Sequence, residues 1–139
     1  MVTAIASVGI QLQVGDGAGP DNFTDVPKVV SGNIPGVGKE LIETTSLDST
    51  GGNREYIPSF NEQKIITCPI FFVPDNTIHN GLWTDAEDGT LRNFKIILTD
   101  TSGTTYSFAA YVKLEGNFAT GEAVQGTLEL SVSGAVVKS

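Results

Sequence analysis

The residues best suited to catalysis are scarce in this chain, which has one cysteine, Cys68, and one histidine, His79. One subunit therefore cannot supply a two-histidine zinc site, or a histidine-based triad with an independent second base. Cys68 lies in the apolar run 65–73, whereas a reactive thiol needs an electropositive and accessible setting. We therefore expect Cys68 to be a buried, inert thiol and His79 to be an ordinary polar residue of a helix.

Three further segments have the composition of a ligand site but not its spacing. Residues 32–39 resemble a phosphate loop, yet the first glycine is displaced by one position and Glu40 stands where the serine or threonine metal ligand belongs. The glycines at 15, 17 and 19 are followed by Pro20, where a dinucleotide site needs the start of a helix. Residues 85–89 lack the ligand spacing and the distal glutamate of a calcium loop. We expect turns and a solvated helix end here, with no metal and no cofactor.

Two chemical alternatives remain open at this stage. Trp83 and Tyr56 could form a stacking surface for sugars, which would make the protein a glycan-binding β-sandwich module. A pair of Asp or Glu residues could hydrolyse a glycosidic bond, because the separation of two carboxylates is set by the fold. The thin supply of His, Cys and clustered acids disfavours the hydrolase, so we expect no enzyme.

Length and charge restrict the other classes. The 139 residues suffice for one domain, residues 1–139, with a hydrophobic core, and 40% of them are hydrophobic. The formal net charge is −8, and no cluster of Lys and Arg is suited to neutralising successive phosphates. No apolar run is long enough to span a membrane. Tight nucleic-acid binding and membrane insertion are therefore not expected.

Hydrophobic alternation predicts a mainly β protein. Residues 104–114 and 122–132 alternate most clearly, and a tight turn at 100–103 joins the former to a strand at 91–98. Residues 62–73 are apolar enough for burial on both faces over part of their length. Helical spacing after a capping segment predicts one helix at about 75–88. The remaining expectations are strands at 8–14 and 39–45, a short, bulged or edge strand within 26–38, and a long loop at 46–58.

These elements predict a single-domain β-sandwich or partly open barrel with one short flanking α-helix. The segment 44–60 is too long for an idle connection, since structureless loops of that length are usually functional or disordered. It contains two glycines that permit a bend, two opposite charges and an apolar strip, all suited to docking. These residues are Gly51, Gly52, Arg54, Glu55, Tyr56, Ile57, Pro58 and Phe60.

Three stretches of the sequence resemble a known family. Residues 45–58 fit the pattern T-x-L-D-S-x-G-G-x-R-E-Y-I-P, residues 89–96 fit G-x-x-R-x-[WF]-x-I, and residues 128–134 are similar to V-x-L-x-V-S-G. In this order they resemble the major tail tube proteins of long-tailed, non-contractile bacteriophages. Ser59 replaces the glycine expected after Pro58. Since the sequence runs to Ser139, we do not expect the immunoglobulin-like decoration domain that some relatives carry.

The resemblance implies a structural virion protein of the phage tail, assembled in the host cytoplasm. Six copies would form a ring through open sheet edges, and stacked rings would form a hollow tube. Its partners would be itself, the tape-measure protein, the tail terminator and distal tail proteins, while DNA passes through the lumen without specific binding. By match to the family, the contacts between rings or subunits fall on Thr45, Leu47, Asp48, Gly51, Gly52, Arg54, Glu55, Tyr56, Ile57, Pro58 and Phe60.

The acidic balance acquires a mechanistic interpretation in such a tube. A lumen with the same sign of charge as DNA would repel it and keep it mobile during ejection. We take Glu115, Glu122 and Glu129 as the candidates for lumen-facing acids.

Overall fold

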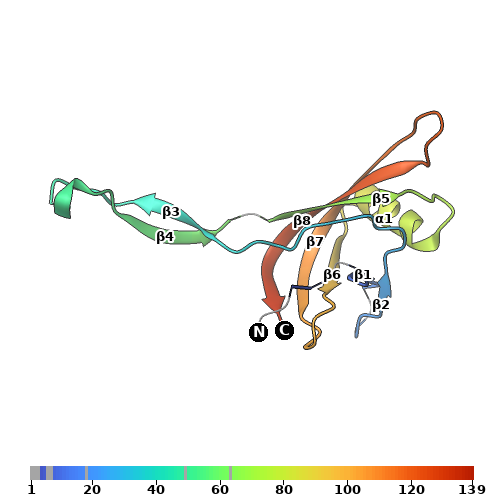
Figure 1. The fold of residues 1–139 in the computed structure, drawn as a ribbon, viewed down its shortest axis with the longest axis horizontal. Coiled ribbons are helices and arrows are strands. Elements are labelled where there is room, and N and C mark those ends of the chain that lie inside the picture. The colour runs from blue at the N-terminus through green and yellow to red at the C-terminus, as the bar shows by residue number, and fades with distance from the viewer. Residues whose placement is uncertain (1–3, 6–7, 18, 49, 63) are drawn as a thin grey trace.

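The computed structural model describes residues 4–5, 8–17, 19–48, 50–62 and 64–139. Its strands form a six-stranded antiparallel sheet in the order β2-β1-β6-β7-β8-β5 and a separate two-stranded sheet, β3-β4 (Figure 1). The elements are β1 (Gln11–Gly15), β2 (Phe23–Asp25), β3 (Lys39–Glu43), a 3-10 turn (Thr50–Gly52), β4 (Tyr56–Asn61), β5 (Ile65–Phe71), α1 (Thr77–Asp88), β6 (Leu91–Ile97), β7 (Thr105–Asn117) and β8 (Gln125–Lys138). The prediction of a mainly β fold with one short helix is confirmed, and the described sheets do not close into a barrel.

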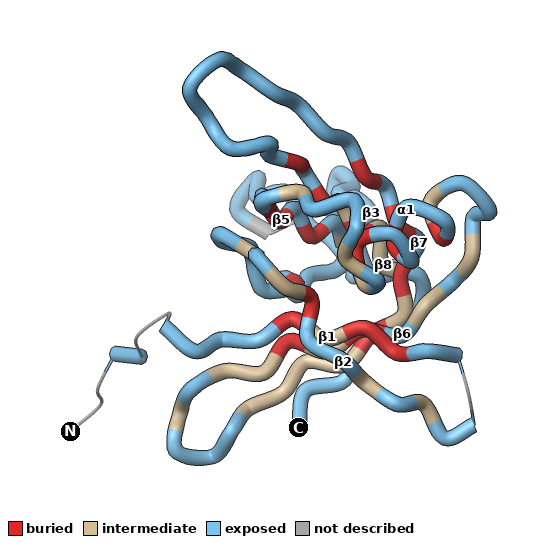
Figure 2. Tube along the Cα trace, turned by 90° about the vertical axis from the view of Figure 1, so that its right-hand side faces the viewer, coloured by how far each residue is buried: buried red, intermediate tan, exposed pale blue. Residues whose placement is uncertain are grey.

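The core lies on one face of the large sheet, under α1. Along β7 the residues Phe108, Ala110, Val112 and Leu114 are buried, as the predicted alternation requires. Figure 2 shows buried stretches on the strands of the body, while most of the connecting loops are exposed. The prediction that residues 62–73 are buried on both faces over part of their length is wrong, because β5 alternates strictly and turns only one face to the core.

The strand boundaries agree only in part with those predicted from the sequence. The turn that joins β6 to β7 closes through a hydrogen bond of 3.0 Å from the Gly103 N–H to the Asp100 carbonyl. β8 continues to Lys138, six residues past its predicted end, because its last residues pair with the start of β7 across a bulge. The three-residue strand β2 falls where the sequence predicts none, and it forms by pairing with β1.

The outer edge of β5 is covered by a segment of the same chain. The backbone of residues 28–30 hydrogen-bonds to residues 69–71, and the Asn33 side chain continues this pairing. Its Oδ1 accepts from the Thr67 N–H at 2.8 Å, and its Nδ2 donates to the Ile65 carbonyl at 3.1 Å. The strand predicted within 26–38 is thus reduced to an isolated bridge, and this segment occupies the outer edge of β5.

The ends of α1 follow the predicted capping chemistry. The Asn76 side chain accepts hydrogen bonds from the N–H groups of Ile78 at 2.9 Å and His79 at 3.2 Å. Gly89 ends the helix in the left-handed conformation, with φ 71°. The helix is therefore confirmed within two residues of its predicted start, and at its predicted end.

His79 is fully buried, so the prediction of an ordinary polar helix residue is wrong. Its Nδ1 accepts from the Val73 N–H at 3.0 Å, and its Nε2 lies 2.8 Å from the Pro27 carbonyl oxygen. Because that carbonyl only accepts, the proton must sit on Nε2 and the ring is the neutral tautomer. His79 thereby joins the helix, the end of β5 and the segment that covers the β5 edge.

Two β-hairpins project from the body at its opposite ends. One is β3-β4, which extends along the longest axis of the molecule away from α1 (Figure 1). The other is the β7-β8 hairpin, whose tip carries the exposed Phe118 and Val124. We call residues 38–62, from the start of β3-β4 pairing to its end, the arm.

Candidate self-assembly interface

The arm contains the segment that the sequence singled out for docking, but its conformation differs from the prediction. Residues 46–58 were expected to form a loop, whereas Tyr56 begins β4 and pairs with Glu43 of β3. The ladder places Leu41 opposite Pro58 and Ile42 opposite Ile57. The predicted apolar strip is therefore a strand, because a partner 15 residues earlier (Ile57 to Ile42) supplies the pairing that local pattern does not reveal.

Hydrogen bonds extend the ladder beyond the strands at both ends of the arm. Near the tip, the Thr44 N–H donates to the Glu55 carbonyl at 2.8 Å, and the Glu55 N–H donates to Thr45 Oγ1 at 2.8 Å. At the base, the Glu62 N–H donates to the Gly38 carbonyl at 3.1 Å. These bonds make residues 38–62 one continuous ribbon that leaves the body as a unit.

The tip of the arm is a tight turn built on two glycines. Gly51 and Gly52 have φ of 69° and 71°, in the left-handed region where a side chain is strained. The expectation that these glycines permit a bend is confirmed. Arg54, Asp48 and Leu47 are exposed around this turn, so charge and apolar surface are both presented at the far end of the arm.

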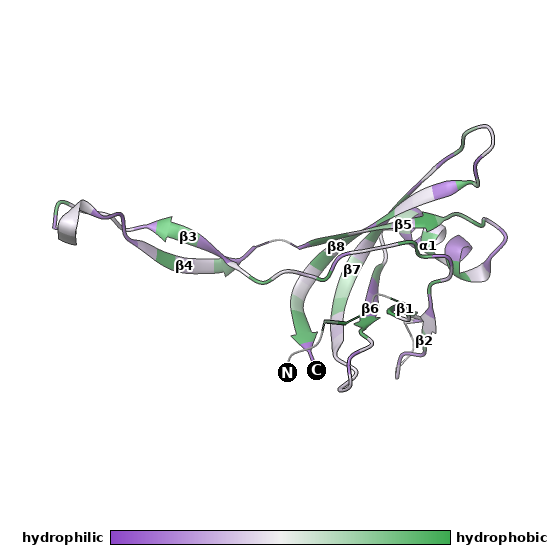
Figure 3. Cartoon of the chain, viewed as in Figure 1, coloured by the Kyte–Doolittle hydropathy of each residue, from purple (hydrophilic) through white to green (hydrophobic). Residues whose placement is uncertain are grey.

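Nearly all residues of the two strands of the arm are exposed to solvent. All five residues of β3 are exposed, and in β4 only Ser59 is half-buried. The exposed apolar side chains are Leu41, Ile42, Leu47, Tyr56, Ile57 and Phe60. Figure 3 shows hydrophobic stretches along β3 and β4, well away from the core. An isolated two-stranded ribbon is at best marginally stable in water, so this surface is suited to burial against another molecule.

The candidate lumen acids do not form one group. The register places Glu129 beside Lys113 of β7 and beside Thr67 of β5, on the face of the sheet that points away from the core. Glu115 lies on the same face, two residues further along β7. Glu122 lies in the connection between β7 and β8, outside the sheet. This open face thus carries two of the three acids, next to one lysine.

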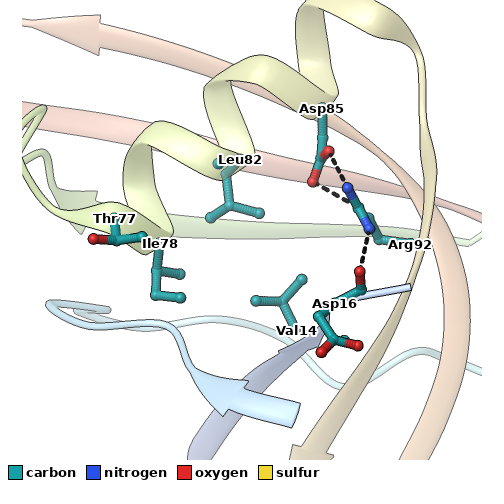
Figure 4. A pocket seen from close by; sticks show the side chains of 9 residues that line it. Val14, Asp16, Thr77, Ile78, Leu82, Asp85 and Arg92 are labelled. Carbon is teal, nitrogen blue, oxygen red and sulfur yellow. Dashed lines mark hydrogen bonds and ion pairs between the residues drawn. The ribbon is translucent and has the colours of Figure 1, made fainter. Parts of the chain in front are cut away.

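Arg92 is a structural residue whose role the sequence did not reveal. Its guanidinium binds the Asp85 carboxylate through two hydrogen bonds of 3.0 Å and donates a third, of 2.9 Å, to the Asp16 carbonyl (Figure 4). The Asp85 hydrogen bond is the main cause that raises the pKa of Arg92, which keeps the side chain charged. Asp85 was expected at a solvated helix end, but it is buried by this pairing.

A shallow hollow of about 220 Å³ lies beside this pair, between α1 and β1. Figure 4 shows Ile78 and Leu82 pointing from the helix toward Val14, with Arg92 and Asp16 at the other end. Arg92 already bonds to the Asp85 carboxylate and to the Asp16 carbonyl. These groups therefore hold α1 against the sheet and are not available to bind a ligand. The signal available in the sequence was the spacing Asp85 to Arg92 across a helix end, which alone is too common to interpret.

The aromatic residues considered for glycan stacking are separated. Trp83 lies on α1, and its ring packs against Phe72 at a centroid distance of 5.9 Å. Tyr56 lies on the arm, on the other side of the body along the long axis (Figure 1). The two rings cannot form one platform in a subunit, so a glycan-binding module would have to use either ring alone.

The described residues also limit other chemistry. Across these parts of the chain, His, Cys, Asp and Glu form no group of three or more that could hold a metal ion. Burial raises the pKa of the Cys68 thiol to about 11, which agrees with the expected inert thiol. Within the same described ranges, no helix has the length and apolar composition needed to cross a membrane.

Comparison with known proteins identifies the fold. The sequence matches no protein-family model and no curated protein sequence. Among solved structures, subunits of tail tubes match nearly the whole length of this chain, and its fold is that of a tail tube protein. The resemblance seen in the sequence is therefore confirmed at the level of the fold.

Three of these structures show the range of the likeness. The tail of an empty gene transfer agent particle, refined with C6 symmetry, gives a TM-score of 0.82 at 17% identity, covering 98% of this chain and 99% of that chain. The tail tube of SPP1 gives 0.75 at 13% identity, covering 97% and 78%. A sheath–tube complex of an extracellular contractile injection system gives 0.69 at 17% identity, covering 98% and 91%.

Proposed function

We propose that this protein is a non-enzymatic structural subunit that assembles with copies of itself into stacked hexameric rings. The stacked rings form the hollow tail tube of a virion, through which DNA is ejected. The observation that carries this proposal is the match to a C6-symmetric tail over 98% of the chain. Because almost the whole chain is covered, the matched architecture includes the arm as well as the body.

The geometry of the subunit supports this kind of assembly. A ring or stack built from identical subunits needs two different surfaces per copy, so that each subunit contacts the next in the same sense. The arm supplies one such surface at one end of the long axis, and the body supplies the other (Figure 1). The predicted contact residues, from Thr45 to Phe60, all lie on the arm and remain our candidates for inter-ring contacts.

The remaining parts of the proposal follow from the sequence resemblance. Residues 1–139 act as a single tail-tube domain, built in the host cytoplasm and resident in the tail. A tape-measure protein occupies the growing lumen, and a tail terminator and distal tail proteins cap its two ends. DNA later passes the open face of the sheet, where Glu115 and Glu129 repel its phosphates without binding them.

Negative-stain electron microscopy of the purified protein at rising concentration tests this function. We expect rings or tubes of the wild-type protein. The variants Arg54→Ala and Tyr56→Ala should keep the fold and lose tube growth, because both residues are exposed on the arm. Ser102→Ala, in the exposed turn between β6 and β7, serves as the matched control and should assemble normally. A wild-type protein that stays monomeric at every concentration would contradict the proposal.

A further inference from the structure

The segment 28–33, which we call the strap, lies along the outer edge of β5 between two buried residues. Val26 is buried just before the strap, and Pro35 is buried just after it. Within the strap Val29 is half-buried, and the other five residues are exposed. The strap is therefore fixed at its two ends, and in between it is held mainly by hydrogen bonds to β5.

The outward N–H groups in the middle of β5 are either bound by the strap or absent. Backbone groups alternate between the two sides of a strand, so those of residues 67, 69 and 71 point away from β8. The Phe71 N–H donates to the Lys28 carbonyl at 2.9 Å, and the Thr67 N–H donates to Asn33 Oδ1 at 2.8 Å. Pro69 has no N–H, which is typical of an edge strand. None of these three positions therefore offers a free donor to another chain.

The strap is bound differently at its two ends. Near its start, the Val30 N–H donates to the Pro69 carbonyl at 2.9 Å, main chain to main chain. At its end, one side chain, that of Asn33, makes both bonds, to the Thr67 N–H and to the Ile65 carbonyl. An exposed side chain regains rotamer freedom when it lets go, without any change in the paired main chain. The Asn33 end is therefore the part of the strap that opens most readily.

Gly32 lets the strap pass close to Cys68. A Cβ atom on Gly32 would lie 2.9 Å from Cys68 Sγ, a separation that folded proteins essentially never show. The φ angle of Gly32 is outside the left-handed region, so the glycine is needed for space and not for its backbone conformation. The closed strap consequently depends on a residue without a side chain at position 32.

We propose that the strap is an edge guard: closed, it prevents free subunits from pairing through β5, and its Asn33 end opens while the body stays folded. Opening exposes the Thr67 N–H and the Ile65 carbonyl to an extended segment of a second copy of this chain. An uncovered strand edge is a template for such pairing, which leads to irregular aggregates. The inference concerns the free subunit, so it goes beyond the proposed function and does not depend on it.

Amide hydrogen exchange, followed by NMR on the purified subunit, tests the opening of the strap. In Asn33→Ala the Thr67 N–H loses its partner, and we expect its exchange rate to rise at least about tenfold. The Phe71 N–H, which is bound to main chain, should change by less than about twofold. Ser31→Ala, in the same exposed strap, is the matched control and should leave both rates as in the wild type. An unchanged rate at Thr67, or an equal rise at Thr67 and Phe71, would overturn the independent opening.

Sedimentation velocity at rising concentration tests the guard itself, with electron microscopy to tell irregular aggregates from tubes. We expect Asn33→Ala to form irregular aggregates at a concentration at least about tenfold below that of the wild type. Gly32→Ala should act in the same way, because the added methyl group pushes the strap away from Cys68. Combining Gly32→Ala with Cys68→Ala removes the sulfur that this methyl group meets, and should restore the behaviour of Cys68→Ala alone.

The outcomes separate this inference from the proposed function. Variants with an open strap that aggregate no more than the wild type would overturn the edge guard and leave the proposed function standing. Aggregation of Gly32→Ala that persists when Cys68→Ala is added would also count against it, because the displaced strap would then not be the cause. Failure of the wild type to form tubes would contradict the proposed function and leave the edge guard untouched, since the guard is measured on free subunits.

Discussion

Arg92 gives the sharpest test of how the body is held together. Its guanidinium joins α1, through Asp85, to β6 and to the turn after β1, through the Asp16 carbonyl. Arg92→Ala leaves the Asp85 carboxylate buried without its cation. Breaking a buried pair in this way costs about 3–5 kcal/mol. The Arg92 side chain keeps 26% of its surface exposed, so solvent screening lowers the expected loss to about 2–3 kcal/mol.

Urea unfolding and thermal melting measure this loss directly. At about 4 °C per kcal/mol for a domain of this size, the melting temperature should fall by about 10 °C. Arg92→Lys should lose about 1 kcal/mol, because an ammonium keeps the charge but cannot make the two parallel bonds. Tube growth well below the melting temperature should persist, since Arg92 is not on the arm.

A double-mutant cycle separates the ion pair from general loss of packing. Arg92→Ala, Asp85→Asn and the double variant should give a coupling free energy of about 2 kcal/mol. Additive losses, with a coupling below about 0.5 kcal/mol, would refute the reasoning, because Arg92 would then stabilise the body without acting through Asp85.

Two further predictions address the buried histidine and the open face of the sheet. His79→Ala should lower the free energy of unfolding by about 3 kcal/mol in urea titrations, because it leaves two backbone groups without partners; a loss below about 0.5 kcal/mol would contradict the assigned role. Glu115→Lys combined with Glu129→Lys should slow DNA ejection from assembled particles without preventing assembly, because the reversed charges attract phosphates. The same double change at Glu87 and Asp88, exposed on α1, is the control, and equal ejection kinetics in the wild type and both variants would exclude the lumen assignment.

Local pattern was sufficient wherever one side of an element meets the core. β7 was predicted because its consecutive residues alternate between apolar and polar. α1 was predicted because its apolar residues have helical spacing and Asn76 caps its start. β4 was missed because Tyr56, Ile57 and Pro58 carry no alternation of their own. A strand that buries neither face in its own subunit has no reason to alternate, so its sequence resembles a loop.

The candidate site was also predicted only in those features that depend on local sequence. Its location at 44–60 came from segment length, composition and family resemblance, and all of its named residues fall on the arm. Its β-ribbon conformation could not be read from the sequence, because it depends on which residue of β3 lies opposite which residue of β4. The structural roles of Arg92 and His79 could not be predicted for a similar reason. Arg92 bonds to Asp16, 76 residues away, and His79 bonds to Pro27, 52 residues away.

The sequence by itself determined the fold class, the helix, the lack of a histidine- or cysteine-based catalytic set in one chain, and the segment suited to docking. These features depend on residue type and short-range spacing, which can be read directly from the sequence. Only the tertiary structure decided that this segment is a β-ribbon and that the β5 edge is closed by Asn33. The physical reason is that strand pairing joins residues distant in sequence through backbone groups that every residue carries, so side-chain pattern alone does not specify the partner.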